Sequence, residues 1–380
     1  MDPILFRGAI DMLEYLDNTK PCPSFEGAYE SWSEDLVSLP NEIELSQDES
    51  EKLEAYTDLV GGIFNLFIQS SNPVSKKSVN ERVNHIQSIL DRPNVPQRTQ
   101  AWYEQSRSVL TASEFSAILG TPRALGTLAL QKTLPPREPS TNSSNTACST
   151  SEMGPMDWGV RFEPVVKQIL TTMWKTTILD IGRLIHPNDT KLAASPDGLI
   201  QDAEDQDRIG RLLEIKCPIR RVINNSVPFE YWCQMQIQME VADIDECEYV
   251  EMKLISPYKG DVESYKAPEV KPEYSGNVWI VQDPTTCELV YAYNETELKE
   301  FEEKSFAIIE TIPWHLDRLF NKVISRDRAW FSGTAEKRAE FWKCVEDTAS
   351  GAFVLPASKR SKVINVIKED VNVCKISDDS

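Results

Sequence analysis

The 380-residue chain is poor in the residues that build several common kinds of site. Its 8 cysteines include no CxxC pair, so neither a zinc ribbon nor a disulfide framework is indicated. Its 3 histidines, His85, His186 and His315, are far apart in sequence, which argues against histidine-based metal or nucleophile chemistry. No apolar run approaches the ~20 residues of a membrane span. Met1 and Asp2 begin a mixed polar stretch rather than a signal peptide, so we expect a reduced, intracellular protein without a membrane partner.

Basic residues are also scarce. Lys and Arg total 40 against 60 Asp and Glu, which gives a net charge of −20 and a sequence pI near 4.7. Phosphate binding normally leaves a basic footprint, so this balance argues against a nucleic-acid partner unless the basic residues cluster on one surface. Some of the acidic residues lie in three segments, residues 33–54, 202–207 and 375–380. Those segments lie away from the ionisable residues considered below.

The remaining composition, 41% hydrophobic, suffices for a sizeable core. Residues 1–96 predict an amphipathic helical extension that packs on the main domain. Residues 97–325 alternate helical and strand patterns, which predicts an α/β (α+β) core with a mixed central sheet and flanking helices. Residues 134–151 form a flexible insertion by composition. Residues 326–380 predict a C-terminal helix and a mobile tail.

The core pattern predicts individual elements. We expect helices over residues 98–120 (two short helices), 156–175, 229–243 and 295–347. We expect strands over residues 192–200, 211–219 and 247–255, and a hairpin from 277 to 294.

Two of these strands carry charge where a buried strand should not. "LAASPDGLI" contains Asp197, and "RLLEIKCPI" contains Glu214 and Lys216. Residues two apart on a strand share a face, so Glu214 and Lys216 point the same way. If the strands pair, Asp197 meets Glu214, and two such carboxylates raise each other's pKa unless a cation lies between them. Their oxygens and the backbone carbonyl of Ile215 suit magnesium or manganese.

Lys216 would lie beside such a metal. There it would orient or deprotonate an attacking water and stabilise charge that builds up on a phosphate. Taken alone, Glu-x-Lys is equally typical of a surface ion pair, and SPDG is an ordinary turn. The order of the two pieces and their strand context favour a site.

Together, "SPDGL…LEIKCP" resembles the active-site signature of the PD-(D/E)xK nuclease superfamily, in its lambda-exonuclease or YqaJ viral-recombinase branch. "RTQAWYEQSRSVLTASEF", "WGVRFEPVV" and "YWCQMQIQM" resemble three further blocks of that family, in the family's order, so the resemblance covers residues 97 to 255. It implies a restriction-endonuclease-like fold. It also implies a Mg²⁺-dependent nuclease, with Mn²⁺ as a substitute, that degrades double-stranded DNA from 5′ ends. The product would be a 3′ single strand for recombination.

The resemblance also implies roles for single residues. Glu163 would lie on the metal side as a further ligand, and Gln234 would face the site beside Asp197, Glu214 and Lys216. Arg107, Ser113 and Ser195 would hold the terminal 5′-phosphate. Pro164, directly after Glu163, restricts that residue's backbone.

The residues themselves support a phosphate pocket. Thr111 with Glu114 is a capping-box pattern, and the free N–H groups of the helix it starts form an anion site. The hydroxyls of Thr111 and Ser113 and the guanidinium of Arg107 would complete it. An ordinary capped helix with a surface arginine fits the same letters.

Further along, Tyr231, Gln234 and Gln238 share one helix face, which is equally typical of a polar stripe on a half-buried helix. Arg220 and Arg221 are either DNA contacts or a solvated pair.

Three functions fit these observations. The first is a 5′-to-3′ exonuclease acting on double-stranded DNA ends, with a single-strand annealing protein as a partner and a homotrimer as its assembly by resemblance. The second is a sequence- or structure-specific endonuclease of the same fold, which covalently closed circular DNA would distinguish. The third is a DNA-end-binding protein without catalysis. The helical extension before residue 97 and the insertion between residues 120 and 153 depart from the family pattern.

Overall fold

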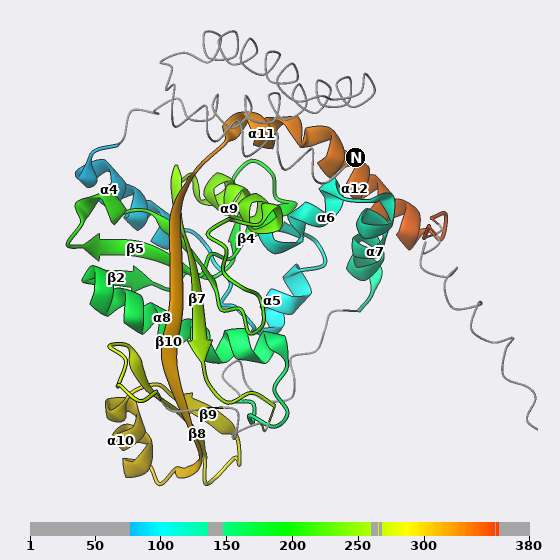
Figure 1. Cartoon of the computed structure of the whole chain (residues 1–380). Coiled ribbons are helices and arrows are strands. Elements are labelled where there is room, and N and C mark those ends of the chain that lie inside the picture. The colour runs from blue at the N-terminus through cyan, green and yellow to red at the C-terminus, as the bar shows by residue number, and fades with distance from the viewer. Residues whose placement is uncertain (1–76, 136–146, 260–264, 266–267, 354, 357–380) are drawn as a thin grey trace, which may run out of the picture.

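The computed structural model describes residues 77–135, 147–259, 265, 268–353 and 355–356. Its centre is a mixed sheet in the order β2-β5-β6-β7-β10-β8-β9 (Figure 1). The strands are β2 (Thr176–Leu179), β5 (Gly198–Ala203), β6 (Leu212–Lys216), β7 (Glu246–Ile255), β8 (Ser275–Gln282), β9 (Leu289–Ala292) and β10 (Ala307–Ser325). β6 and β7 are parallel, whereas the other neighbours are antiparallel. The expected mixed α/β sheet is confirmed.

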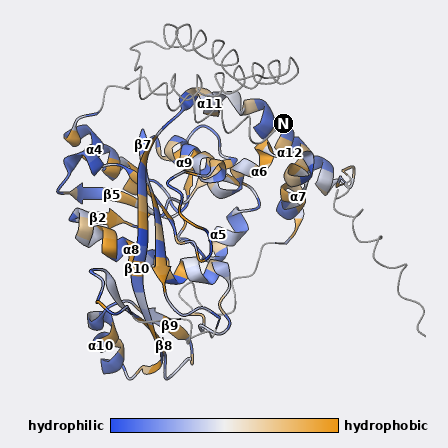
Figure 2. Ribbon diagram, in the orientation of Figure 1, coloured by the Kyte–Doolittle hydropathy of each residue, from blue (hydrophilic) through white to orange (hydrophobic). Residues whose placement is uncertain are grey.

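Helices α8 (Pro155–Trp174) and α9 (Phe229–Ala242) cover opposite faces of this sheet. Leu213 and Ile215 of β6 pack in one core cluster with the apolar residues of α8, while Leu212 packs in the other cluster with those of α9. Because side chains alternate along a strand, Glu214 and Lys216 share the α9 face with Leu212. Figure 2 shows α8 as alternating hydrophobic and hydrophilic stretches, as expected of a helix with one buried face.

A second, small sheet lies beside α9 in the order β1-β4-β3, with β1 (Leu110–Thr111), β4 (Leu192–Ala194) and β3 (Leu184–Ile185). β1 runs parallel to β4 and pairs Thr111 with Ala193. The chain therefore leaves both strands at the same end. Around this sheet lie α5 (Gln100–Gln105), the 3₁₀ turn η2 (Ala112–Glu114), α6 (Phe115–Leu119) and α7 (Pro122–Thr133).

The outlying helices α4 (Val79–Leu90), α11 (Arg328–Gly333) and α12 (Ala335–Ala349) pack on the same core. Ile86 and Ile89 of α4 and Phe341 of α12 belong to the core cluster that contains α9. The domain boundaries at 96/97 and 325/326 stay a prediction. Among the described helices, none is both long and apolar enough to cross a membrane.

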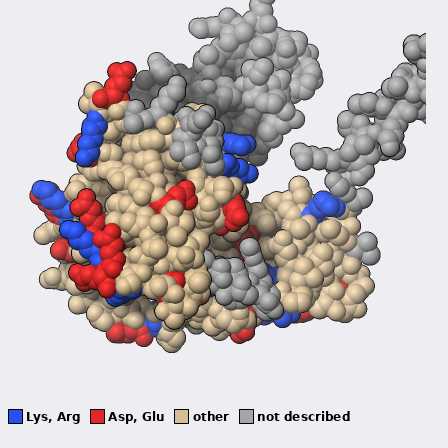
Figure 3. All heavy atoms as spheres, turned by 90° about the horizontal axis from the view of Figure 1, so that it is seen from below, with Lys and Arg blue, Asp and Glu red and all other residues tan. Residues whose placement is uncertain are grey.

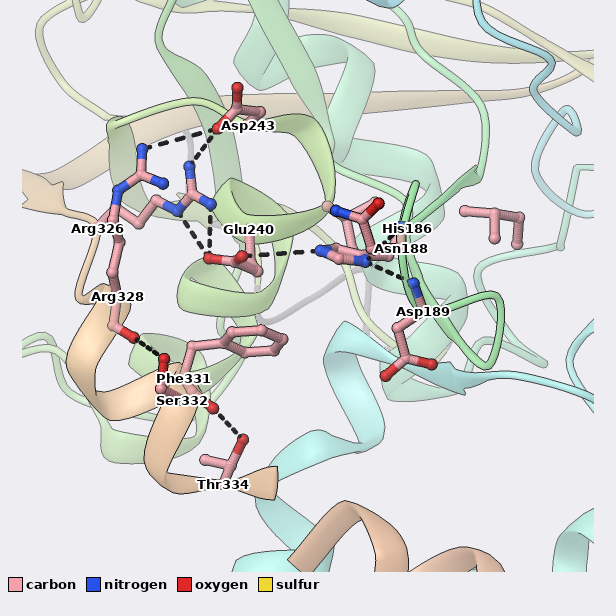
Figure 4. A network of polar contacts seen from close by, with 12 residues as sticks. His186, Asn188, Asp189, Glu240, Asp243, Arg326, Arg328, Phe331, Ser332 and Thr334 are labelled. Carbon is pink, nitrogen blue, oxygen red and sulfur yellow. Dashed lines mark hydrogen bonds and ion pairs between the residues drawn. The ribbon is translucent and has the colours of Figure 1, made fainter. Parts of the chain in front are cut away.

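Hydrogen bonds and ion pairs connect the segment before α11 to the C-terminal end of α9 (Figure 4). Buried Arg326 donates to Oε2 of Glu240 at 2.6 Å and to Oδ1 of Asp243 at 2.7 Å. His186 approaches the other oxygen of Glu240 at 3.7 Å, and its Nδ1 accepts the backbone N–H of Asp189. The network thus ties the β3–β4 turn, α9 and the end of β10 together.

One expectation was wrong. Residues 295–347 are not continuously helical: α10 (Glu295–Glu303) gives way to the 19-residue strand β10, which pairs with β7 along one half and β8 along the other. The apolar residues of β10 recur at three- and four-residue intervals, which favoured a helix, but cross-strand packing decides between helix and strand. Pro313 is the contrary signal, because proline destabilises a helix interior.

The helices expected over residues 156–175 and 229–243, the strands expected over 211–219 and 247–255 and the β8–β9 hairpin lie where the pattern placed them. The first of the two charged strands is divided into β4 and β5, and β1 and η2 separate the two short helices expected over 98–120. The pattern did not predict α7, β2 or β3. The predictions for residues 1–76 and 357–380, and for the middle of the insertion, residues 136–146, lie outside the described residues.

Candidate active site

The two charged strand pieces do converge. β5 and β6 pair Gly198 with Leu213, which brings Asp197 to the end of β6. The backbone N–H of Ile215 donates to Oδ2 of Asp197 at 2.7 Å. Glu214 is fully buried, and Nε2 of Gln238 on α9 donates to its Oε2 at 2.6 Å. Both carboxylates are therefore fixed by hydrogen bonds to strand and helix.

Negative charge is concentrated at this point. Burial, followed by the charges of Glu214 and Glu163, raises the pKa of Asp197 well above its ordinary value, although Lys216 and the Ile215 N–H oppose the shift. A cation between the carboxylates would relieve this repulsion. The N–H and C=O of a strand residue point to the same side, so the Ile215 carbonyl also faces Asp197. Two carboxylates and a carbonyl are the ligands that hard divalent cations prefer.

Glu163 is near this pair but is held by cations of its own. Lys167 donates to its Oε1 at 2.8 Å, and Arg98 approaches its Oε2 at 3.4 Å. Across the parts of the chain that the structure describes, no three His, Cys, Asp or Glu side chains form a ready metal cluster. The donor set that fits a metal directly is thus Asp197, Glu214 and the Ile215 carbonyl. Glu163 would become a further ligand if a metal ion replaced Lys167 or Arg98 as the partner of its carboxylate.

Sequence reasoning missed Arg98. Its backbone is in the left-handed region, with φ of 64°, which is uncommon for a residue other than glycine. Such conformations persist where the surrounding structure fixes them, often at functional sites. A lone arginine three residues after Val95 carries no signal of this in the sequence.

Lys216 lies between the carboxylates and α9. Its Nζ contacts Oε1 of Glu214, donates to Oε1 of Gln234 at 3.2 Å and lies 4.5 Å from the centroid of the Tyr231 ring. Tyr231, Gln234 and Gln238 thus share the face that their spacing predicted. Burial opposes the charge of Lys216, but Glu214 and Asp197 hold its pKa above the ordinary value.

The two arginines after β6 differ. Arg220 is exposed, whereas Arg221 pairs with the buried carboxylate of Glu251 and donates to the hydroxyl of Tyr249. Arg221 is thus partly exposed but paired with a carboxylate, and whether either arginine contacts DNA stays a prediction. Its carboxylate partner, Glu251 of β7, lies 30 residues further along the chain, and no local sequence pattern predicts this pairing.

The residues of the predicted phosphate pocket lie around the end of the small sheet. Both the backbone N–H and Oγ1 of Thr111 donate to Oε2 of Glu114, at 2.9 and 2.7 Å, so the capping box is present. Oγ of Ser113 is 3.3 Å from Oγ1 of Thr111. Oγ of Ser195, just past β4, accepts the indole N–H of Trp102 at 3.3 Å.

Two features of this region depart from the expected pocket. The capped segment is a three-residue 3₁₀ turn followed by the five residues of α6, rather than one regular helix. The hydroxyl of Thr111 already donates a hydrogen bond to Glu114.

Arg107 is exposed, and its guanidinium makes no hydrogen bond or ion pair with any residue that the structure describes. Arg107, Ser113 and Ser195 are thus the groups left to meet a phosphate.

The face of the molecule seen in Figure 3 does not carry the positive charge that would attract a nucleic acid. On the face seen in Figure 3, Lys and Arg side chains are interspersed with Asp and Glu side chains. A phosphate on that face would meet mixed charge rather than a basic patch. On that face, phosphate binding would rest on local groups rather than on a broad basic surface.

Comparison with known proteins shows what part of the chain is similar to. Residues 101–245 match the YqaJ-like viral recombinase domain. This confirms the resemblance drawn from the four sequence blocks, and the matched stretch contains Asp197, Glu214 and Lys216.

Viral proteins are among the relatives. Over 107 residues, the chain is 32% identical to an uncharacterised protein of Acanthamoeba polyphaga mimivirus, covering 25% of this chain and 20% of that protein. Over 174 residues, it is 32% identical to a protein of African swine fever virus, covering 39% of this chain and 46% of that protein. The chain thus spans between a fifth and just under half of the length of these relatives.

Similar solved structures include an alkaline exonuclease from Laribacter hongkongensis, with 17% identity and a TM-score of 0.40, covering 67% of this chain and 95% of that one. The structure of that exonuclease in complex with dAMP gives 18% identity and a TM-score of 0.38, over the same shares of the two chains.

Proposed function

We propose that the chain is a divalent-metal-dependent deoxyribonuclease that degrades duplex DNA from 5′ ends and leaves 3′ single strands for recombination, replication or repair. The observation that carries the proposal is the meeting of Asp197, Glu214 and Lys216 at the ends of paired strands, inside the matched domain. A rigid sheet holds such groups in place better than loops do.

Asp197, Glu214 and the Ile215 carbonyl, with Glu163 as a further ligand, would hold Mg²⁺, or Mn²⁺ in its place. A bound metal would supply a Lewis acid and lower the pKa of water at the site. Lys216 would stabilise the negative charge that develops on the scissile phosphate. The amide of Gln234, which already contacts Lys216, would orient the phosphate or the attacking water.

Arg107, Ser113 and Ser195, with Thr111 behind them, would receive the terminal 5′-phosphate. The parallel pairing of β1 with β4 supports this, because it places the segments that carry Ser113 and Ser195 at the same end of the small sheet. Arg107→Ala should remove any preference for 5′-phosphorylated over 5′-hydroxyl duplex ends and leave the carboxylates undisturbed. A preference that survives this change would place the pocket elsewhere.

The wider setting belongs to the same proposal. The enzyme would act inside the cell, in the cytoplasm or nucleus of a host cell if it is viral. It would pass its 3′ strand to a single-strand annealing protein. A homotrimer would follow the pattern of the family that the sequence resembles.

An endonuclease of the same fold is the second candidate. The commitment of the Thr111 hydroxyl to Glu114 favours it, because it leaves the end pocket with fewer donors. A DNA-end-binding protein without catalysis is the third.

One experiment separates the three. Purified protein is incubated with end-labelled linear duplex and with covalently closed circular DNA, with and without Mg²⁺, and the products are sized. An exonuclease shortens only the linear DNA, from its 5′ end and only with metal. Cleaved circles would establish the endonuclease, and retarded but intact linear DNA would establish the binding protein.

A further inference from the structure

Two buried cations contact residues that adjoin the predicted phosphate pocket. Lys132 and Arg183 are only 5% and 2% exposed. Nζ of Lys132 donates to both carboxylate oxygens of Glu114, at 2.8 and 2.7 Å, and to the backbone oxygen of Ser106 at 2.7 Å. One carboxylate thus serves the pair of cations, and a surplus of one positive charge remains.

Within the described part of the chain, Arg183 is the cation without a carboxylate of its own. Its guanidinium donates to the backbone oxygen of Trp102 at 2.7 Å and to Oγ of Ser106 at 2.9 Å, and it lies 4.1 Å from the centroid of the Trp102 ring. Its buried Nε has no hydrogen-bond partner among the residues that the structure describes. Burial lowers the pKa of Arg183 to about 10, so the group is still charged at neutral pH.

Each group of the pocket is connected to one of these cations through a residue that the cation contacts. Ser106, which both cations contact, directly precedes Arg107. Trp102, which lies against Arg183, donates its indole N–H to Ser195. Glu114, which accepts from Lys132, is joined to Ser113 through the hydroxyl of Thr111.

Such a surplus is costly unless something offsets it. A charge taken out of water without a partner is unfavourable, and buried arginines are normally paired. Arg211 and Arg326 follow that rule, because each pairs with Glu side chains. Arg183 has no carboxylate partner among the described residues, and its Nε is also left without a hydrogen bond there, so a dianion bound nearby would supply the missing negative charge.

We propose that Lys132 and Arg183 form the charged base of the end pocket and make it selective for a dianionic terminal phosphate over an internal phosphodiester. The inference rests on the proposed end-dependent nuclease. Arg183 acts through its neighbours as a positioning residue: it holds Trp102, whose N–H occupies one acceptor site of Ser195. The Ser195 O–H is then left to donate to the phosphate.

Arg161 is a matched control. It is also fully buried and also lacks a carboxylate partner among the described residues. Its donors go instead to Oγ1 of Thr150, the backbone oxygen of Cys148 and the hydroxyl of Tyr291. It therefore has the same chemistry as Arg183 but none of the contacts that lead to the pocket.

The test compares Arg183→Met and Arg183→Lys with Arg161→Met, using the full chain. Two ratios are measured on duplexes with 5′-phosphate or 5′-hydroxyl ends, at fixed salt: initial cleavage rates with Mg²⁺, and dissociation constants in EDTA. Arg183→Met should lower both ratios about tenfold, which corresponds to ~1.4 kcal/mol. Arg183→Lys should keep most of the preference, and Arg161→Met should keep the wild-type ratios even if it melts earlier.

The outcomes separate this inference from the function on which it rests. A folded Arg183→Met protein with wild-type ratios overturns the role of the buried cations and leaves the nuclease standing. A wild-type ratio near one overturns end recognition itself. If Arg183→Met does not fold, Glu114→Gln decides, since it removes the only carboxylate of the group: the preference should rise, and a fall would refute the proposal.

Discussion

Two groups of charges along α9 are built in opposite ways. At the C-terminal end of the helix, Arg326 pairs with both Glu240 and Asp243 (Figure 4). Burial alone would raise the pKa values of these carboxylates, but hydrogen bonds from His186 and Arg326 lower that of Glu240, and Arg326 lowers that of Asp243. On the sheet-facing side, burial together with Glu214 and Glu163 raises the pKa of Asp197 instead.

The difference separates a structural network from a candidate active site. The first group is balanced and favours the charged form of each carboxylate, so it stabilises the fold. The second places two carboxylates, those of Asp197 and the buried Glu214, beside one lysine, so it costs stability unless a cation lies between them. Strongly perturbed carboxylates of this second kind are typical of functional sites. The predictions below test whether the two groups differ in this way.

The largest effect is expected from loss of a carboxylate at the site. Asp197→Ala or Glu214→Ala should reduce Mg²⁺-dependent cleavage by on the order of 10²–10³-fold or more, because a metal contributes several kcal/mol to such a reaction. Initial rates on linear duplex measure this, with Asp243→Ala as a control that should cleave normally. Near-normal magnesium-dependent activity in either site variant would refute the assignment.

Loss of Arg326 should instead damage the fold. Arg326→Met leaves Glu240, whose side chain is 14% exposed, without its arginine, and breaking a buried pair in this way typically costs ~3–5 kcal/mol. Asp243 contributes less, because its side chain is 55% exposed and Arg328 lies 3.7 Å away. Both carboxylates have lowered pKa values in the folded protein, so their contribution is present above the ordinary values of 4.5 and 3.8 and is lost as the pH falls through the lowered ones.

Urea denaturation at pH 7 and at about pH 3 measures this effect, with Arg328→Met as the control, since Arg328 is half exposed. The deficit of Arg326→Met should shrink at the lower pH. An equal deficit at both values would mean that packing, rather than charge, makes Arg326 important.

Lys216→Ala should slow cleavage by about 100-fold, the usual cost of losing a positioned charge-stabilising or proton-transfer group. Binding of metal and of DNA should persist, because the carboxylates and the pocket are untouched. Turnover on saturating duplex and binding with Ca²⁺ in place of Mg²⁺ give the two measurements. Weak DNA binding with normal turnover would make Lys216 a binding residue instead.

The sequence predicts what depends on local pattern. The alternation of Leu213, Glu214 and Ile215 predicts which side chains of β6 face α9, and the spacing of Thr111 and Glu114 predicts the capping box. It does not predict partners that meet through the fold. The contacts of Lys132 with Glu114 and of Arg183 with Trp102 join segments far apart in sequence, and nothing near either cation marks it as buried.

The same limit explains β10. Its residues satisfy a helical period, and the choice of a strand comes from β7 and β8, which pair with it on its two edges. Burial of a charged residue and pairing of a strand are both decided by neighbours that the local sequence does not contain.

The smallest effect should be a gain. Asp197→Asn keeps the shape of the side chain and removes one of two repelling charges, so the metal-free protein should melt later at pH 8, on the order of 2–4 °C for ~1 kcal/mol. Because the pKa of Asp197 is raised in the folded state, the wild-type protein loses stability as the pH rises from the ordinary value of 3.8 toward the raised one. The difference in melting temperature between the two proteins should therefore vanish near pH 4.

Calorimetry in EDTA at both pH values measures this difference, and Mg²⁺ should then stabilise the wild type alone. A variant that melts earlier than wild type at pH 8 would show that Asp197 belongs with Glu240 among the structural carboxylates, and the contrast between the two groups would fail.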